Sequence, residues 1–383
     1  MKKFGTRLLD VFKKGDMVLL ALCTIATLFG IVMIASAAQY DGNSRYLYLQ
    51  SFALIAGVLL FFALTLFDID ILAGQRPLLF LFNTLFLLIL LVWGVEGTSG
   101  NRSWLHFSWL PFNIQPAEVC KITYIVILAK TMSVHRNRIS SVKTVSQLTF
   151  HMLYLLALIV VISSDLGVAL IFIFIFLVMA YVGGVSGWWF LGGAGALAVA
   201  GPYVWQNLFR GDQKLRIQAL FDPSIDPTGE GVLWQTNKCL EALRNGGLSG
   251  QGLFHGDLTA KGNLPAQHTD SIFASIGEQL GLIGCLAVLL LLLAIVARCI
   301  YVGMKSPDYM NRLICIGIAA MLLFQIVINV GMCIGLFPII GLALPFFSYG
   351  GTSIITSFIA MGIVSGIKMR PEPDISAHYI RPY

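Results

Sequence analysis

Long apolar runs alternate with short polar linkers over almost the whole chain. Each run approaches the ~20 residues that an α-helix needs to cross the hydrocarbon core of a bilayer. The pattern predicts an all-α polytopic membrane protein, with residues 1–383 forming a single integral-membrane domain. The runs indicate about ten transmembrane helices, at residues 17–38, 46–67, 77–95, 117–133, 145–163, 166–184, 187–206, 280–301, 313–337 and 350–369.

One polar stretch, residues 207–269, separates the seventh and eighth predicted helices and is too long to be a bare connector. Its segment 221–229 contains two Asp-Pro steps and ends in glycine, which is typical of a turn cluster. Leucines then recur at roughly helical spacing over 232–244, and Asn245-Gly246-Gly247 should stop that helix. We therefore expect a long structured extracellular loop containing a short re-entrant or interfacial helix.

Composition and charge agree with this picture. The chain is 57% hydrophobic and 11% charged, whereas soluble domains carry about 25% charged residues. Basic residues gather before the first run, around 136–143, around 298–312 and after the last run, so the positive-inside rule places these groups in the cytoplasm. The N-terminal segment 1–16 and the tail 370–383 are then cytoplasmic, and the charge-balanced stretch 207–269 lies outside. No basic stripe on a polar domain indicates nucleic-acid binding.

The seven cysteines lie mostly inside apolar runs and form no CxxC pair, so we expect small buried hydrophobic residues and no cysteine metal site. No GxxxxGK[ST] loop supports ATP-driven transport. Asp68-Ile69-Asp70 imitates a nucleotide-sugar transferase motif, but the expected topology places it on the cytoplasmic side, away from the long loop.

Two opposite charges open the fourth predicted helix. Pro116 suits a first helical turn, and Glu118 and Lys121, three residues apart, share one face. The pair can line a polar cavity, or it can lock this helix to its neighbours as a structural ion pair. Upstream, Arg102 can grip a phosphate or a lipid headgroup, and Trp104 can anchor the chain at the membrane interface.

Three further groups fall on the expected outer side. Asp165 lies in a short turn and is best explained as a helix cap. The stretch 345–353 contains Ser348, Tyr349 and two glycines, which allow a backbone to approach a ligand closely or simply turn the chain into the last helix. His268-Thr269-Asp270 places two ionisable side chains where the chain enters the membrane, so Asp270 is either a cap or a chemical group in a wet cavity.

The order of these motifs resembles one family. Arg102-Ser-Trp104, Gln115-Pro-Ala-Glu118-Val-Cys-Lys121, Asp165-Leu-Gly167, Asp226-Pro-Thr-Gly229, Leu264-Pro-Ala-Gln-His-Thr-Asp270 and Leu344-Pro-Phe-Phe-Ser-Tyr-Gly-Gly-Thr-Ser353 are similar to the shape, elongation, division and sporulation family, of the RodA, FtsW and SpoVE type. The resemblance covers nearly the whole chain, and the short C-terminal tail favours a RodA-like member.

The resemblance implies a peptidoglycan glycosyltransferase of the bacterial cytoplasmic membrane. Such proteins polymerise lipid II into β-1,4 glycan strands on the outer face, in cell elongation or division, beside a class B penicillin-binding protein and other cell-wall proteins. Asp270 is then the expected catalytic residue, either as a general base or as a ligand of a divalent cation, Mg²⁺ or Mn²⁺. The residues expected to bind substrate or diphosphate are Arg102, Trp104, Glu118, Lys121, Arg210, Arg216, His268, Ser348 and Tyr349.

Two other functions fit part of the pattern. A lipid II flippase would use Glu118 and Lys121 to move the headgroup, and a noncatalytic scaffold would only hold a penicillin-binding protein. A flippase needs a polar path that reaches the cytoplasmic side, whereas the suspicious charges gather on the outer side. The distribution of charge therefore favours the enzyme.

Overall fold

The computed structural model describes residues 11–40, 42–95, 102–108, 110, 112–207 and 209–370. Each of the ten predicted apolar runs overlaps a helix. Within the described residues, seven helices are long and apolar enough to cross a membrane, and α9 (Leu166–Val182) is a shorter apolar helix. The chain is therefore a helical multi-pass membrane protein, and the count of ten spans stays a prediction.

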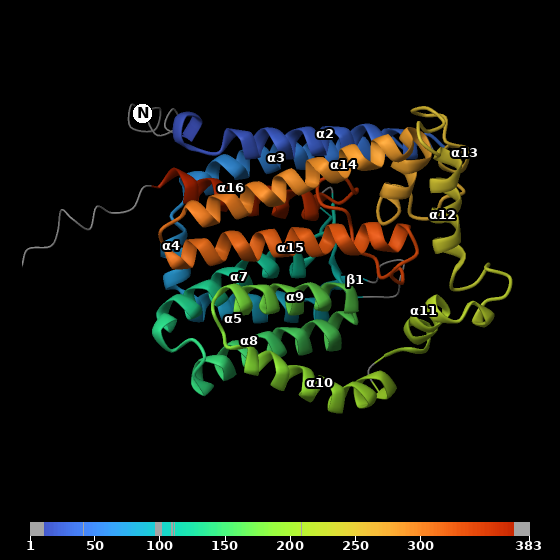
Figure 1. Ribbon diagram of the computed structural model, residues 1–383. Helices are drawn as coiled ribbons and strands as arrows, with labels where there is room; N and C mark the ends of the chain where they lie inside the picture. Colours follow the sequence, from blue (N-terminus) through green and yellow to red (C-terminus); the bar gives the residue numbers. More distant parts are fainter. Residues whose placement is uncertain are drawn as a thin grey trace, which may run out of the picture.

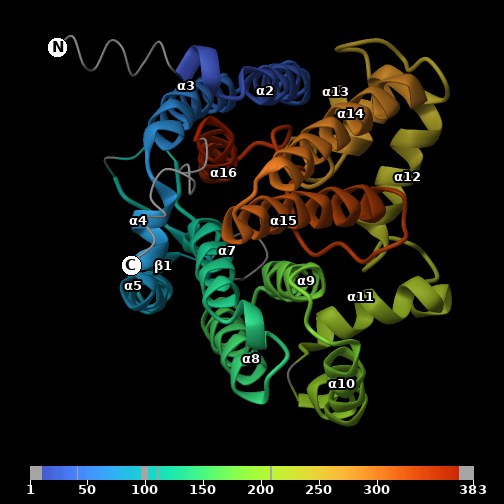
Figure 2. The same ribbon diagram turned by 60° about the vertical axis from the view of Figure 1, so that its left-hand side comes forward.

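The long helices lie side by side in one bundle (Figures 1 and 2). The bundle helices are α2 (Met17–Ala37), α3 (Arg45–Leu66), α5 (Arg76–Leu88) with α6 (Leu90–Trp93), α7 (Pro116–Val134), α8 (Val142–Leu158) with a π-helical turn (Ile159–Ser163), α9, α10 (Gly187–Asn207), α14 (Ile272–Lys305), α15 (Tyr309–Cys333) and α16 (Gly351–Met369).

Local sequence explains several helix ends. Asp16 accepts a hydrogen bond from the Leu19 N–H and begins α2, and Ser141 does the same for α8 through the Thr144 N–H. Pro116 occupies the first turn of α7 as predicted. All seven cysteines are buried and free, which confirms the prediction that they act as small hydrophobic residues.

The two ends of the described chain meet at one end of the bundle, which we call the terminal end. The Asp16 N–H donates to the Ser365 hydroxyl at 2.9 Å, so the start of α2 touches the end of α16. The short helix α4 (Ile69–Gly74) and the 3-10 turn Arg136–Arg138 also lie at this end (Figure 1). Most of segments 1–16 and 370–383 fall outside the described residues.

The opposite end, which we call the loop end, carries the structured stretch between α10 and α14 (Figure 1). The predicted helix at 232–244 is confirmed as α12 (Trp234–Gly246), and it ends at Gly247 as expected. Asp226 organises the predicted turn by accepting from the N–H groups of Gly231 and Leu233. The other elements here are α11 (Gly211–Phe221), a 3-10 turn (Pro223–Ile225), α13 (Asp257–Ala260) and the two-residue strands β1 (Gly94–Val95) and β2 (Trp104–Leu105), which pair antiparallel.

The predicted start of the eighth membrane helix at residue 280 was wrong. Helix α14 begins at Ile272, and its backbone breaks at Gly281, where φ is +65°. The first segment holds polar Ser275, Glu278 and Gln279, whose hydropathy suggests a solvated loop. They are buried because tertiary partners satisfy them: Glu278 accepts from the Leu258 and Thr259 N–H groups at 2.7 and 3.0 Å.

The break in α14 is filled by backbone from the loop end. The Leu282 N–H donates to the Gly247 carbonyl at 2.9 Å, and the Gln251 N–H donates to the Glu278 carbonyl at 3.0 Å. A Cβ on Gly281 would clash with the Gly250 nitrogen, so only glycine permits this approach. Irregular backbone at this depth is tolerated because protein covers it. The ninth predicted helix also ends early, at Cys333 and not at residue 337.

Candidate functional site

Asp270 lies in the turn that leads into α14, at the loop end. Its main-chain carbonyl accepts a hydrogen bond from Asn329 Nδ2 at 2.9 Å, which fixes the turn against α15. The residue that caps α14 is Ser271, so the alternative that Asp270 caps this helix is wrong. Within the described part of the chain, its half-buried carboxylate accepts no hydrogen bond.

The surroundings of Asp270 disfavour its charged form. Burial raises the pKa of the carboxyl from its ordinary 3.8 to about 6, and the negative charge of Asp165 adds to the shift. A Cβ on Gly341 would lie 3.7 Å from Asp270 Oδ2, so the segment between α15 and α16 passes directly beside the carboxylate. A carboxylate with this pKa is mostly ionised at neutral pH and is a better base than an exposed aspartate.

Asp165 is the second acid of the site. It caps α9 as predicted, because Oδ1 accepts from the Val168 N–H at 3.1 Å, while Oδ2 lies 3.4 Å from the Ser103 hydroxyl. Burial raises the pKa of its carboxyl, the two hydrogen bonds lower it, and Glu118 and Lys121 act on it from α7. The fold thus brings together two acids that are far apart in sequence.

Glu118 and Lys121 form the predicted ion pair on α7. Lys121 Nζ lies 2.7 Å from Glu118 Oε1, and the two residues are 1% and 8% exposed respectively. The Thr356 hydroxyl of α16 donates to Glu118 Oε2 at 3.3 Å. The pair therefore ties α7 to α16, and it also lies within electrostatic range of Asp165.

The rings of His268 and Tyr349 contact each other, and His268 lies two residues before Asp270. Tyr46 of α3 packs against both rings, with centroid distances of 4.6 and 5.0 Å. The Tyr349 N–H donates to the His268 carbonyl at 2.7 Å, and the Ser348 hydroxyl donates to the Thr269 carbonyl at 2.6 Å. Ser348 and Tyr349 therefore hold the His268–Asp270 turn in place.

The remaining predicted binding residues are more scattered. An Arg210 guanidinium nitrogen donates to the Ser164 hydroxyl at 2.9 Å, next to Asp165, whereas Arg216 donates to the Ile339 carbonyl at 2.8 Å. Trp104 is half-buried in β2. Arg102 is exposed and forms no ion pair or hydrogen bond with the described residues. Contact of any of these residues with substrate stays a prediction.

Asn329 and Glu278 were not among the residues predicted for the site. Asn329 is fully buried and donates to the carbonyls of both Asp270 and Leu342, so it joins the two segments beside the carboxylate. Glu278 holds α13 in place, as described above. Asn329 could have been found from the sequence, because it is a polar residue inside the predicted apolar run 313–337. Such a group is buried only where partners satisfy its hydrogen bonds.

Comparison with known proteins identifies the family. A model of the cell cycle proteins FtsW, RodA and SpoVE matches residues 16–372. The chain belongs to this family. It is 34% identical over 373 residues to the probable peptidoglycan glycosyltransferase FtsW of Trichlorobacter lovleyi, covering 93% of this chain and 94% of that protein. It is 30% identical over 368 residues to the stage V sporulation protein E of Bacillus subtilis, covering 92% and 96%.

Solved structures of the family share the fold. One, from work on the structural coordination of polymerization and crosslinking by a peptidoglycan synthase complex, has a TM-score of 0.76 and 30% identity, and the match covers 92% of this chain and 97% of that one. The rod shape determining protein RodA of Thermus thermophilus has a TM-score of 0.68 and 29% identity over 92% of this chain and 96% of that one. The family predicted from the motifs is therefore confirmed.

Proposed function

We propose that this family member is a peptidoglycan glycosyltransferase that polymerises lipid II into β-1,4 glycan strands during cell elongation or division. The observation that carries the proposal is the unpaired, half-buried Asp270 carboxylate, on which Asp165 acts electrostatically, in a chain whose relatives are named as peptidoglycan glycosyltransferases. The Glu118–Lys121 pair acts in turn on Asp165. An isolated carboxylate in such a place is costly, which supports a chemical role.

In the proposed reaction, the 4-hydroxyl of the acceptor sugar attacks the anomeric carbon of the growing strand, which leaves from undecaprenyl diphosphate. The new C–O bond forms as the bond to the diphosphate breaks, and the hydroxyl proton passes to Asp270. General-base assistance of this kind contributes typically about 10²–10⁴-fold. The raised pKa of Asp270 brings the base closer to the pKa that this proton transfer requires.

The departing diphosphate needs positive charge. Lys121 is a buried cation within electrostatic range of Asp165, and Arg210 reaches the same neighbourhood through Ser164. Either cation can stabilise negative charge on the leaving oxygen. His268 and Tyr349, whose rings contact each other, are further proposed contacts of the substrate.

A divalent cation is compatible with the two carboxylates. Mg²⁺ is often held by one or two carboxylates together with substrate phosphates, and Asp270 with Asp165 offers that pair, although no group of three or more His, Cys, Asp or Glu side chains gathers within the described residues. When bound, Mg²⁺ or Mn²⁺ would neutralise the diphosphate. Asp270 would then be a metal ligand, and the base role and the ligand role are alternatives for one carboxylate.

The proposed orientation places the terminal end in the cytoplasm of a bacterium and the loop end outside. Its support is the distribution of charge, because basic residues cluster at the terminal end, where the positive-inside rule applies. Within the described chain these are Lys13, Lys14, Arg136, Arg138, Lys143, Arg298, Lys305, Arg312, Lys368 and Arg370. We further propose a class B penicillin-binding protein as the cross-linking partner, supported by the similarity to a chain from a peptidoglycan synthase complex.

The deciding experiment uses purified full-length protein and labelled lipid II in detergent, with and without the partner, and measures glycan polymer. Polymer is expected, and it cannot arise from lipid flipping because detergent micelles have no two sides. Absence of polymer under both conditions, from protein that remains folded, would contradict the proposal.

A further inference from the structure

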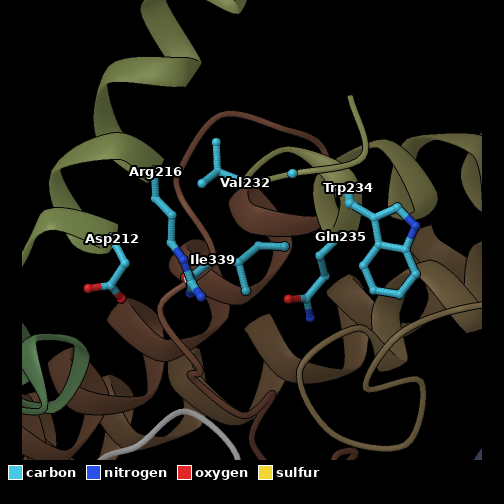
Figure 3. A pocket seen from close by; sticks show the side chains of 7 residues that line it. Asp212, Arg216, Val232, Trp234, Gln235 and Ile339 are labelled. Carbon is cyan, nitrogen blue, oxygen red and sulfur yellow. Dashed lines mark hydrogen bonds between the residues drawn. The ribbon is translucent and has the colours of Figure 1, made fainter. Parts of the chain in front are cut away.

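A cavity of about 330 Å³ opens at the loop end between α11 and the start of α12. Figure 3 shows Asp212 and Arg216 extending from α11, Gln235 and Trp234 on the other side, and Ile339 between them. The last belongs to the segment that connects α15 to α16. The lining residues come from three separate parts of the chain, at 212–216, 231–235 and 339, which only the tertiary structure brings together.

Hydrogen bonds within the protein hold the walls of the cavity in place. The Arg216 guanidinium donates to the Ile339 carbonyl at 2.8 Å, which fixes one wall to the other. Val232 forms another part of the lining, and Asp226 holds it in place. The Asp226 carboxylate accepts from the N–H groups of Gly231 and Leu233, on either side of Val232, at 3.0 and 2.9 Å. A site whose walls are held by such bonds does not have to be ordered by its ligand.

The lining identifies a class of ligand. Asp212 and Arg216 carry opposite charges, so the cavity does not favour a diphosphate. Arg216 was expected to bind that group, but no second cation lies among the residues that line the cavity. Trp234, Val232 and Ile339 supply apolar surface, while Gln235 forms no hydrogen bond within the described chain and keeps its amide for a ligand. A pyranose ring has matching chemistry, with apolar C–H faces and polar substituents at its edge.

One short segment relates the cavity to Asp270. Ile339 lines the cavity, and Gly341, two residues on, lies beside the Asp270 carboxylate. The size fits too, because 330 Å³ is near the lower end of the ~300–1,000 Å³ typical of small-molecule sites. That volume suits a sugar unit and not a polyprenyl tail.

From these observations we infer that the cavity is a saccharide subsite, which binds an N-acetylhexosamine unit of a β-1,4-linked strand next to Asp270. The inference rests on the proposed function for the identity of the strand, but the binding itself does not require catalysis. Trp234 would pack on a ring face, and Asp212, Arg216 and Gln235 would bond the hydroxyl and amide groups.

The test measures binding of short β-1,4-linked N-acetylglucosamine oligomers to the full chain by ligand-observed NMR. The protein is held in lipid nanodiscs, because detergents with sugar headgroups would compete. Trp234→Ala and Gln235→Ala are each expected to weaken binding at least about tenfold, the effect of losing roughly one good contact. Lys238→Ala, on α12 but outside the lining, is the matched control and should bind as the unchanged protein does.

The outcomes separate this inference from the proposed function. Asp270→Asn should bind the oligomer normally although it makes no polymer. The subsite is refuted if the unchanged protein polymerises lipid II but binds no oligomer, or if all variants bind the oligomer equally. Neither result would contradict the proposed glycosyltransferase function. If a sugar-free stem pentapeptide displaces the oligomer completely, the ligand class is wrong. Binding at the cavity without any polymer would refute the function and leave the subsite.

A second readout is the length of the glycan product. Loss of a subsite for the strand should release it earlier, so Trp234→Ala is expected to shorten the average strand by at least about twofold, because remote binding energy holds the substrate at the reacting centre. An unchanged length distribution in a variant with an unchanged melting temperature would contradict the subsite.

Discussion

Asp16 at the terminal end and Asp270 at the loop end both lie just before a membrane helix, yet their carboxylates have opposite surroundings. Asp16 is fully buried and satisfied: it caps α2, and it pairs with Arg298 at 2.8 Å and with Lys368 at 3.4 Å. Asp270 is half-buried, caps no helix and pairs with no cation in the described chain. The charge that acts on it is that of another acid, Asp165.

The difference separates two uses of a carboxylate near a membrane. Three elements meet at Asp16, since α2, α14 and α16 each supply one member of the cluster, so the charge holds helices together. At Asp270 the backbone is held by Asn329 and the side chain is left free. A group that stabilises the fold is expected to have its partners within the protein, whereas a group that acts on a ligand keeps its capacity for the ligand.

The largest expected effect follows from Asp270→Asn. Glycan synthesis by purified protein should fall by at least about 10²-fold, because the general base is lost. Asp222→Asn, an exposed aspartate of the same loop region, is the control and should keep full activity. Near-normal polymerisation by Asp270→Asn would contradict a catalytic role for Asp270 and with it the contrast to Asp16.

The same variant makes a prediction about stability. The pKa of Asp270 is raised in the folded protein, so its contribution to stability is present below its ordinary value of 3.8 and is lost as the pH rises through about 6. At neutral pH, Asp270→Asn should therefore melt at the same temperature as the unchanged protein or higher. A clear loss of thermal stability, measured by intrinsic fluorescence, would indicate a structural role instead.

For Asp16→Asn the expectation is reversed, because Arg298 and Lys368 lose their partner. Breaking a buried pair costs about 3–5 kcal/mol, and since the two cations are 24% and 35% exposed, we expect the lower end of that range or less. Activity per folded molecule should not change. Asp68→Asn, which removes an exposed carboxylate at the same end, should have little effect on melting.

The Glu118–Lys121 pair is the case between these two extremes. Lys121→Met alone leaves Glu118 buried without its cation, so both stability and activity should fall. Adding Glu118→Gln should restore most of the stability. If Lys121 serves the diphosphate, activity stays low in the double variant; if the pair only locks α7 to α16, activity returns with stability.

The smallest effect is expected from Asp165→Asn. Asparagine keeps the cap on α9, because its side-chain oxygen also accepts from the Val168 N–H. Removing the negative charge should lower the pKa of Asp270, so the acidic limb of the pH–activity profile should move to lower pH. A limb that stays in place would mean that Asp165 does not act on the base.

Much of the local structure followed from sequence alone. The apolar runs located the helices, Pro116 and Asp165 marked helix starts, and Gly247 marked the end of α12. The Glu118–Lys121 contact was also predictable, because residues three apart share a helix face. These features depend on neighbours a few residues away, and the motifs then identified the family.

Only the tertiary structure decided the rest. Residues 272–279 lay outside the predicted helix 280–301, but they form the first part of α14, where Leu258, Thr259 and the 247–252 segment satisfy their polar groups. Likewise, nothing local places Asp165 near Asp270 or Ile339 against Arg216. Burial and charge act through space, so the partners that decide whether a carboxylate is satisfied or free lie far away in the sequence.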